Sequence, residues 1–129
     1  MSPKLFRIIL PVSDVEDAAR FYAQVLAIEG ERVSPGRHYF NCNGAILACY
    51  DPRADGDSSD ATPNPGHIYI AVEDLEETYS RCEGANCRQL DDGVATRPWG
   101  ERSFYLVDPF GNNVCFVDDE TMFTTLDRS

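Results

Sequence analysis

The sequence is poor in basic residues and has no long apolar segment, and both shortages limit its partners. Its 129 residues include 11 Lys and Arg against 22 Asp and Glu, a formal net charge of −11 at pH 7. Such a surface repels phosphate backbones and anionic headgroups, so we expect neither a nucleic-acid nor a membrane partner. No segment approaches the roughly 18 apolar residues of a membrane span, and the first ten residues lack a signal-peptide pattern. These features predict a soluble, cytoplasmic protein.

Cysteine pairs of the zinc-binding or redox type are also missing. The five cysteines form no CxxC motif, and Cys82 and Cys87 are separated by four residues with no second Cys or His pair nearby. Without a secretion signal, the cysteines fit reduced thiols better than a disulfide framework. A structural zinc site is therefore not expected. No Ser-His-Asp arrangement, phosphate-binding loop or dinucleotide fingerprint is found either.

The residues that are present form an internal repeat with an offset of 60 positions. Four identities carry it, pairing Ile8, Val12, Asp14 and Glu16 with Ile68, Val72, Asp74 and Glu76. In each copy, alternating apolar residues predict a strand with one buried face. An Asp then stands at a helix N-cap with an acidic residue three positions later. We expect the two helices to end at Glu29-Gly30 and Glu83-Gly84, because glycine commonly terminates helices.

Three further strands are predicted after each helix. In the first half they span about 31–33, 37–42 and 45–50, with Asn43-Gly44 as a type I′ hairpin turn. In the second they span about 86–90, 101–107 and 113–118, with a turn at 108–111. The chain thus reads as one α+β domain, 1–129, of two βαβββ modules at about 4–50 and 66–118. Residues 51–65 form a linker.

This pattern resembles the vicinal oxygen chelate superfamily, the glyoxalase/bleomycin-resistance/dioxygenase group. The matching residues are Val12-Ser-Asp14, Arg20-Phe-Tyr22, Gly66-His67-Ile68, Pro98-Trp-Gly100 and the segment 103–112. The resemblance implies a half-open, curled mixed sheet with helices on its outer face. It also implies chains that pair as homodimers. Strand alternation then sorts the side chains: Arg7, Ile9, His67, Tyr69, Ser103, Tyr105 and Cys115 face the cup, whereas Ile8, Leu10, Ile68, Ile70, Val114 and Phe116 face the helices.

Metal-dependent members of the group place ligands at four cup positions, which here carry Arg7, Ala48, His67 and Cys115. Arginine only donates hydrogen bonds and alanine has no donor atom for a metal. His67 and Cys115 remain, and two ligands fall short of the three that a catalytic site usually has. We therefore expect no cofactor. If zinc or another divalent metal is found, His67 and Cys115 are its predicted ligands.

The candidate ligand-binding residues each keep a plainer alternative. Arg7 either clamps an anionic group or forms an ion pair, and His67 either contacts a ligand or caps a strand. Trp99 lines the pocket mouth or packs in the core. Cys115 is an activated thiol or an inert buried one. The full set is Arg7, His67, Tyr69, Trp99, Tyr105 and Cys115.

Three functions remain open at this point, and the fold alone does not choose among them. The first is a metal-free protein that binds or sequesters a small planar or aromatic compound, as the drug-resistance members of the family do. The second is a metal-dependent lyase, isomerase or dioxygenase. The third is a metal-independent enzyme that uses Arg7, His67, Tyr105 or Cys115 as acid, base or nucleophile. Whether any reaction is catalysed is left open.

Overall fold

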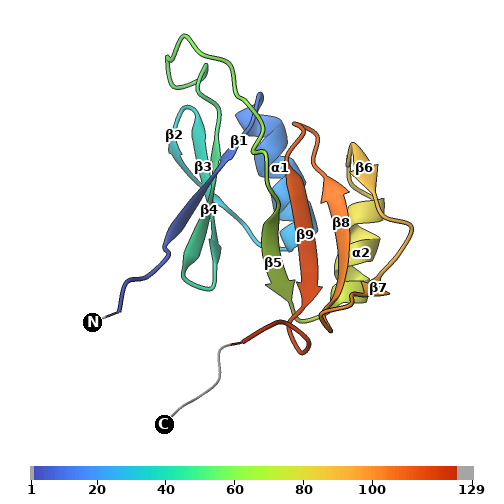
Figure 1. The fold of residues 1–129 in the computed structure, drawn as a ribbon. Helices are drawn as coiled ribbons and strands as arrows, with labels where there is room; N and C mark the ends of the chain where they lie inside the picture. Colours follow the sequence, from blue (N-terminus) through green and yellow to red (C-terminus); the bar gives the residue numbers. More distant parts are fainter. Residues whose placement is uncertain (1, 125–129) are drawn as a thin grey trace.

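The computed structural model describes residues 2–124, and each half of the chain folds as a strand, a helix and a set of antiparallel strands (Figure 1). The first half comprises β1 (Arg7–Pro11), α1 (Val15–Leu26), β2 (Glu31–Ser34), β3 (Arg37–Cys42) and β4 (Ala45–Tyr50). The second comprises β5 (Ile68–Val72), α2 (Leu75–Glu83), β6 (Gln89–Leu90), β7 (Ala95–Thr96), β8 (Arg102–Val107) and β9 (Asn113–Asp118).

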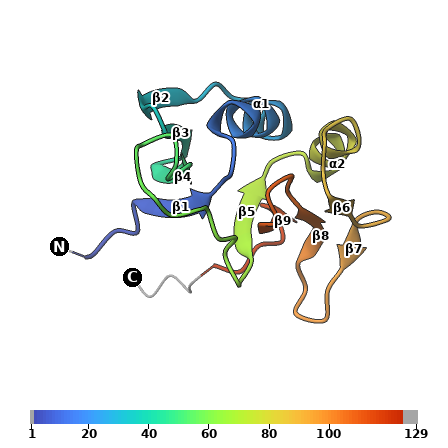
Figure 2. The same cartoon turned by 90° about the horizontal axis from the view of Figure 1, so that it is seen from above.

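The strands form two open mixed sheets, one from each half. The first has the order β1-β4-β3-β2, and the second has the order β5-β9-β8-β6 with β7 also paired to β8. In both sheets the first strand runs parallel to the last, so that Ile9 lies opposite Ala48 and Tyr69 opposite Cys115. The predicted α+β class and its two repeated modules are confirmed. Each sheet has one face toward the helices (Figure 2), and we call the opposite faces the outer faces.

Both helices begin as the repeat predicts. The Asp14 carboxylate accepts a hydrogen bond from the Asp17 backbone N–H (3.1 Å), and Asp74 does the same for Glu77 (3.0 Å). These caps satisfy backbone donors that the first helical turn leaves free. Gly84 caps α2 as expected.

The predicted end of α1 is wrong, because the helix stops at Leu26 and Ala27 takes the left-handed conformation with φ 55°. Gly30 has a different role. A Cβ at Gly30 would lie 2.6 Å from His38 Nε2, so glycine allows the chain to pass close to β3.

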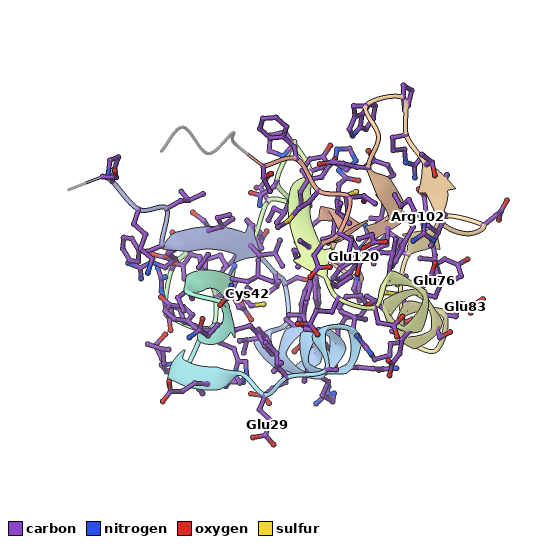
Figure 3. All side chains as sticks on the ribbon, turned by 90° about the horizontal axis from the view of Figure 1, so that it is seen from below. Glu29, Cys42, Glu76, Glu83, Arg102 and Glu120 are labelled. Atoms are coloured by element: carbon purple, nitrogen blue, oxygen red, sulfur yellow. The ribbon has the colours of Figure 1, made fainter. Side chains whose placement is uncertain are left out.

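One apolar cluster contains residues of both halves. Fully buried members include Leu10 of β1, Phe40 of β3, Phe104 of β8 and Phe116 of β9. The predicted alternation is confirmed, since these side chains face the helices while Arg7, His67 and Tyr69 are exposed on the outer faces. At the start of α2, Arg102 of β8 pairs with Glu76 and with Asp118 (2.8 Å), which ties this helix to the second sheet (Figure 3).

The hairpin turns differ in how closely they follow prediction. Asn43 and Gly44 have φ 54° and 100°, which is the type I′ turn expected between β3 and β4. The strand expected at 86–90 is shorter, and it is followed by the additional strand β7. Asp91 ends β6: its carboxylate accepts hydrogen bonds from the Tyr105 backbone N–H (2.9 Å) and from Arg97 (3.3 Å).

The segment between the modules contains no helix or strand, as predicted, but it is fixed to the first sheet. The Asp51 backbone N–H donates to the Gly36 carbonyl (2.7 Å). The Asp55 carboxylate accepts from the Gly36 N–H (2.6 Å) and from the Ser34 hydroxyl (2.9 Å). Within residues 2–124, neither helix is long and apolar enough to cross a membrane.

A buried polar network joins the two halves at the turn between β8 and β9. Tyr22 of α1 donates its hydroxyl to the Asp108 carboxylate (2.7 Å). The Asn112 amide donates to the Pro11 carbonyl (2.6 Å) and to Asp108 (3.1 Å), and its oxygen accepts from the Asn64 N–H (2.9 Å). The Asp-Pro-Phe-Gly-Asn turn therefore has a structural role, because it fixes β1, α1 and the linker to the second sheet.

Candidate functional site

Four of the predicted site residues lie together on the outer face of the second sheet. Tyr69 of β5 and Tyr105 of β8 flank Cys115 of β9 in register, so that all three share one row. His67 stands just before β5. Its ring lies 5.1 Å from that of Tyr105 and 6.2 Å from that of Tyr69, and the two tyrosine rings are 6.5 Å apart. We call His67, Tyr69 and Tyr105 the aromatic triad.

The aromatic triad borders two shallow recesses. His67 and Tyr105 line one of about 420 Å³, together with the polar side chains of Gln89, Asp91 and Asn113. Tyr69 lines the other, of about 370 Å³. Its remaining walls are Ala71, Trp99, Glu101, Val117, Met122 and Phe123. One recess is thus mainly polar and the other mainly aromatic and apolar.

Trp99 lies at the surface, which excludes core packing as its role. Its side chain is 61% exposed, and the indole N–H donates to Glu101 Oε1 (2.9 Å). The other carboxylate oxygen, Oε2, accepts from the Phe123 backbone N–H (2.7 Å). Glu101 therefore fixes both the indole and the segment after β9 beside the second recess. The sequence offered no indication of this role for Glu101.

Cys115 and Tyr105 both keep their protons at neutral pH. Cys115 is fully buried beneath the triad. Burial raises the pKa of the Cys115 thiol, which favours the inert alternative over an activated nucleophile. Burial, followed by the hydrogen bond with Tyr69, raises the pKa of Tyr105 to about 12. The Tyr105 hydroxyl can thus donate a hydrogen bond to a ligand, but it is poorly suited to act as a base.

Arg97 supports Tyr105 although the sequence did not single it out. Its guanidinium carbon lies 4.8 Å from the centroid of the Tyr105 ring, and Nε donates to the Ser103 hydroxyl (2.8 Å). Together with the ion pair to Asp91 (3.3 Å), these contacts hold the guanidinium in one place. Arg97 immediately precedes the Pro-Trp-Gly segment, but its partners come from strands that only the fold brings near.

Arg7 lies on β1 of the other sheet, and its side-chain contacts among residues 2–124 are with Tyr39 and Phe6 rather than with the triad. Within the described residues it forms no ion pair with Asp or Glu, so the ion-pair alternative does not hold there. Its NH1 group instead donates to the Tyr39 hydroxyl (3.0 Å) on the outer face of the first sheet. Arg37 donates to the same oxygen at the same distance. Arg37 was missed by the sequence analysis.

The four positions that carry metal ligands in the resembling family offer a poor donor set here. The register places Ala48 at the position equivalent to Cys115. Arg7 and Ala48 supply no ligand atom, and Cys115 is buried as a protonated thiol. Between residues 2 and 124, no three His, Cys, Asp or Glu side chains are grouped as a metal site requires. The residues therefore do not fit the metal that the resemblance implies.

An apolar groove of about 460 Å³ lies between the two sheets. Its walls include the strand β5, the β3–β4 hairpin, Leu26 at the end of α1, and Ile28. Cys42 of the hairpin is labelled in Figure 3. Tyr69 is the one predicted site residue on its wall. Sequence analysis could not find this groove, because it depends on how the two sheets sit against each other.

Comparison with known proteins points to one superfamily. The family model described as "Glyoxalase/Bleomycin resistance protein/Dioxygenase superfamily" matches residues 4–116. The chain is 26% identical over 118 residues to the uncharacterized protein YwbC of Bacillus subtilis (strain 168), covering 81% of this chain and 89% of YwbC.

Two solved structures show the same fold. A glyoxalase-related enzyme from Fulvimarina pelagi matches with a TM-score of 0.74 at 21% identity, covering 98% of this chain and 95% of that one. A lactoylglutathione lyase from Agrobacterium tumefaciens matches with a TM-score of 0.70 at 22% identity, covering 91% and 94%. At these identities the structural matches speak for the fold alone.

Proposed function

Because the chain belongs to the Glyoxalase/Bleomycin resistance protein/Dioxygenase superfamily, we propose that it is a metal-free member that binds or sequesters a small planar or aromatic compound. The single observation that carries this proposal is the aromatic triad on the outer face of the second sheet, with the exposed Trp99 beside it. Aromatic side chains at the surface offer flat apolar area for stacking. The compound would lie across the triad.

The chemistry around the triad suits a neutral or weakly polar ring system. Each recess falls within the roughly 300–1,000 Å³ range typical of small-molecule sites. The Tyr105 hydroxyl and the amides of Gln89 and Asn113 provide a few polar groups to orient a ligand. Apolar walls with a small number of polar groups are the usual composition of such sites.

The proposal also takes the family's metal site to be lost in this chain. Its support is the donor chemistry at the four equivalent positions, of which Arg7 and Ala48 cannot coordinate a cation. A buried Cys115 with a raised pKa likewise gives little support to thiolate chemistry. Binding without a metal is therefore the function that these residues fit best.

We expect a planar probe such as quinoline to quench the fluorescence of Trp99, the only tryptophan in the chain. Trp99→Ala should weaken quinoline binding about three- to tenfold, because stacking contributes about 0.5–1.5 kcal/mol. Its melting temperature should hardly change, since a 61% exposed side chain packs little. Heteronuclear NMR titrations of both proteins measure the affinities, and calorimetry measures the melting.

Two controls sharpen this experiment. Trp99→Phe keeps an aromatic ring and should retain most of the affinity, and a chelator should leave the titration unchanged if no metal takes part. Unaltered binding in Trp99→Ala would contradict the stacking site. A loss of quinoline binding when the chelator is added would favour the metal-dependent alternative.

We further propose that the protein is a cytoplasmic homodimer. Large apolar side chains outside the proposed binding sites are also exposed, and a second copy would cover them; they include Leu5, Ile28 and Val33. We expect sedimentation equilibrium to give twice the 14.4 kDa chain mass. A monomer at micromolar concentration would contradict the dimer.

A further inference from the structure

Two arginines converge on one tyrosine hydroxyl on the outer face of the first sheet. Arg7 of β1 and Arg37 of β3 each donate an NH1 hydrogen bond of 3.0 Å to the Tyr39 oxygen. Between them, β4 contributes Ala48, which pairs with Ile9 on one side and Tyr39 on the other. The small Ala48 side chain leaves room above the strand for two long side chains to meet.

The charges in this cluster are not balanced. Other arginines, such as Arg20 and Arg53, have a carboxylate within 3 Å. Within residues 2–124, Arg7 has no carboxylate at ion-pair distance, and Arg37 has Asp55 at 3.7 Å. Asp55 is already used by the Gly36 and Ser34 hydrogen bonds. An excess of positive charge thus remains at one point of a chain whose net charge is −11.

Aromatic rings hold the two guanidinium groups in place. Arg7 Cζ lies 5.1 Å from the centroid of the Phe6 ring, and Arg37 Cζ lies 4.3 Å from that of Tyr50. Such contacts orient a guanidinium without using its N–H donors. The Tyr39 hydroxyl accepts two hydrogen bonds and keeps its own proton to donate. Burial raises the pKa of Tyr39, but the two arginine hydrogen bonds and charges outweigh it and lower that pKa.

We propose that this cluster is a binding site for the carboxylate of a small organic acid, held by Arg7 and Arg37 with the Tyr39 hydroxyl as a third donor. The planar fork of a guanidinium matches the two oxygens of a carboxylate. Phe6 and Ile9, which are 57% and 38% exposed, offer apolar contact for the rest of the molecule. Glu31 lies opposite Tyr39 in the β2–β3 pair. Its negative charge repels a dianion such as phosphate more than it repels a monocarboxylate.

Benzoate and benzamide form a matched pair of probes, because they share a ring but only benzoate carries the charge. In an NMR titration, benzoate should shift the side-chain N–H signals of Arg7 and Arg37 in a saturable way, and benzamide should not. Arg7→Gln should weaken benzoate binding about three- to tenfold, as expected for losing a charge-assisted contact at an exposed site. Tyr39→Phe should weaken it by a smaller factor.

Arg20→Gln is the matched control, since it removes the same charge from an exposed side chain on α1. Equal weakening in Arg20→Gln, equal shifts from benzamide, or tighter binding of inorganic phosphate would overturn the proposal. The Trp99 indole signal reports separately on the second sheet. A silent Trp99 with saturable Arg7 shifts would support the carboxylate site even if the triad binds no aromatic compound.

Discussion

Replacing Asn112 by Ala should lower the free energy of unfolding by about 2–4 kcal/mol, because several groups lose their partner and each such buried group costs about 1–3 kcal/mol. The fully buried Asn112 amide serves three partners, which are the Pro11 carbonyl, the Asp108 carboxylate and the Asn64 N–H. Pro11 belongs to the first sheet and Asp108 to the turn after β8. The substitution therefore weakens the connection between the two halves. Urea unfolding followed by circular dichroism measures the change.

Asn113→Ala is the matched control at the next position. Asn113 is only half-buried and its side chain forms no hydrogen bond to any described residue, so we expect a change of about 0.5 kcal/mol or less. Tyr22→Phe removes the other hydrogen bond to Asp108 Oδ2. Asn112 donates to the same oxygen. The losses of unfolding free energy caused by Asn112→Ala and Tyr22→Phe should therefore not add up in the double variant. Equal losses for Asn112→Ala and Asn113→Ala would show that the turn does not join the halves.

The parts of the fold that sequence reasoning predicted are those fixed by local chemistry. The Asp14 and Asp74 caps satisfy N–H groups three residues away, and Asn43-Gly44 tolerates the positive φ of its turn. Strand alternation needs only neighbouring residues, and it placed the side chains on the correct faces. The end of α1 was wrong because Gly30 is required by its contact with β3, which is a tertiary constraint.

The candidate site was harder to predict, because strand alternation gives the face on which a side chain lies but not which strands are neighbours in the sheet. His67, Tyr69 and Tyr105 come together since β5 and β8 both flank β9. Arg7 comes from β1, which pairs with β4 in the other sheet. The partners of Arg7 therefore come from β3, 30 and more residues away in the chain. Long-range contacts of this kind leave no periodic pattern in the sequence.

Gly36→Ala should be the other strongly destabilising substitution, with an expected loss of about 3–5 kcal/mol from overpacking and broken hydrogen bonds. A Cβ at this position would lie 2.3 Å from the Asp51 carbonyl oxygen and 2.9 Å from the Asp55 nitrogen. Both atoms belong to the backbone, so no side-chain rotation relieves the contact. The segment 51–55 would have to move away from the first sheet.

That movement would break the hydrogen bonds that Gly36 makes to Asp51 (2.7 Å) and to the Asp55 carboxylate (2.6 Å). It would also take Asp55 away from Arg37. Gly93→Ala is the control, because a Cβ there meets no atom within 4 Å. We expect that variant to be neutral or more stable by about 0.4–1 kcal/mol, through a less flexible unfolded chain. Similar unfolding free energies for the two variants would show that the linker is not fixed at Gly36.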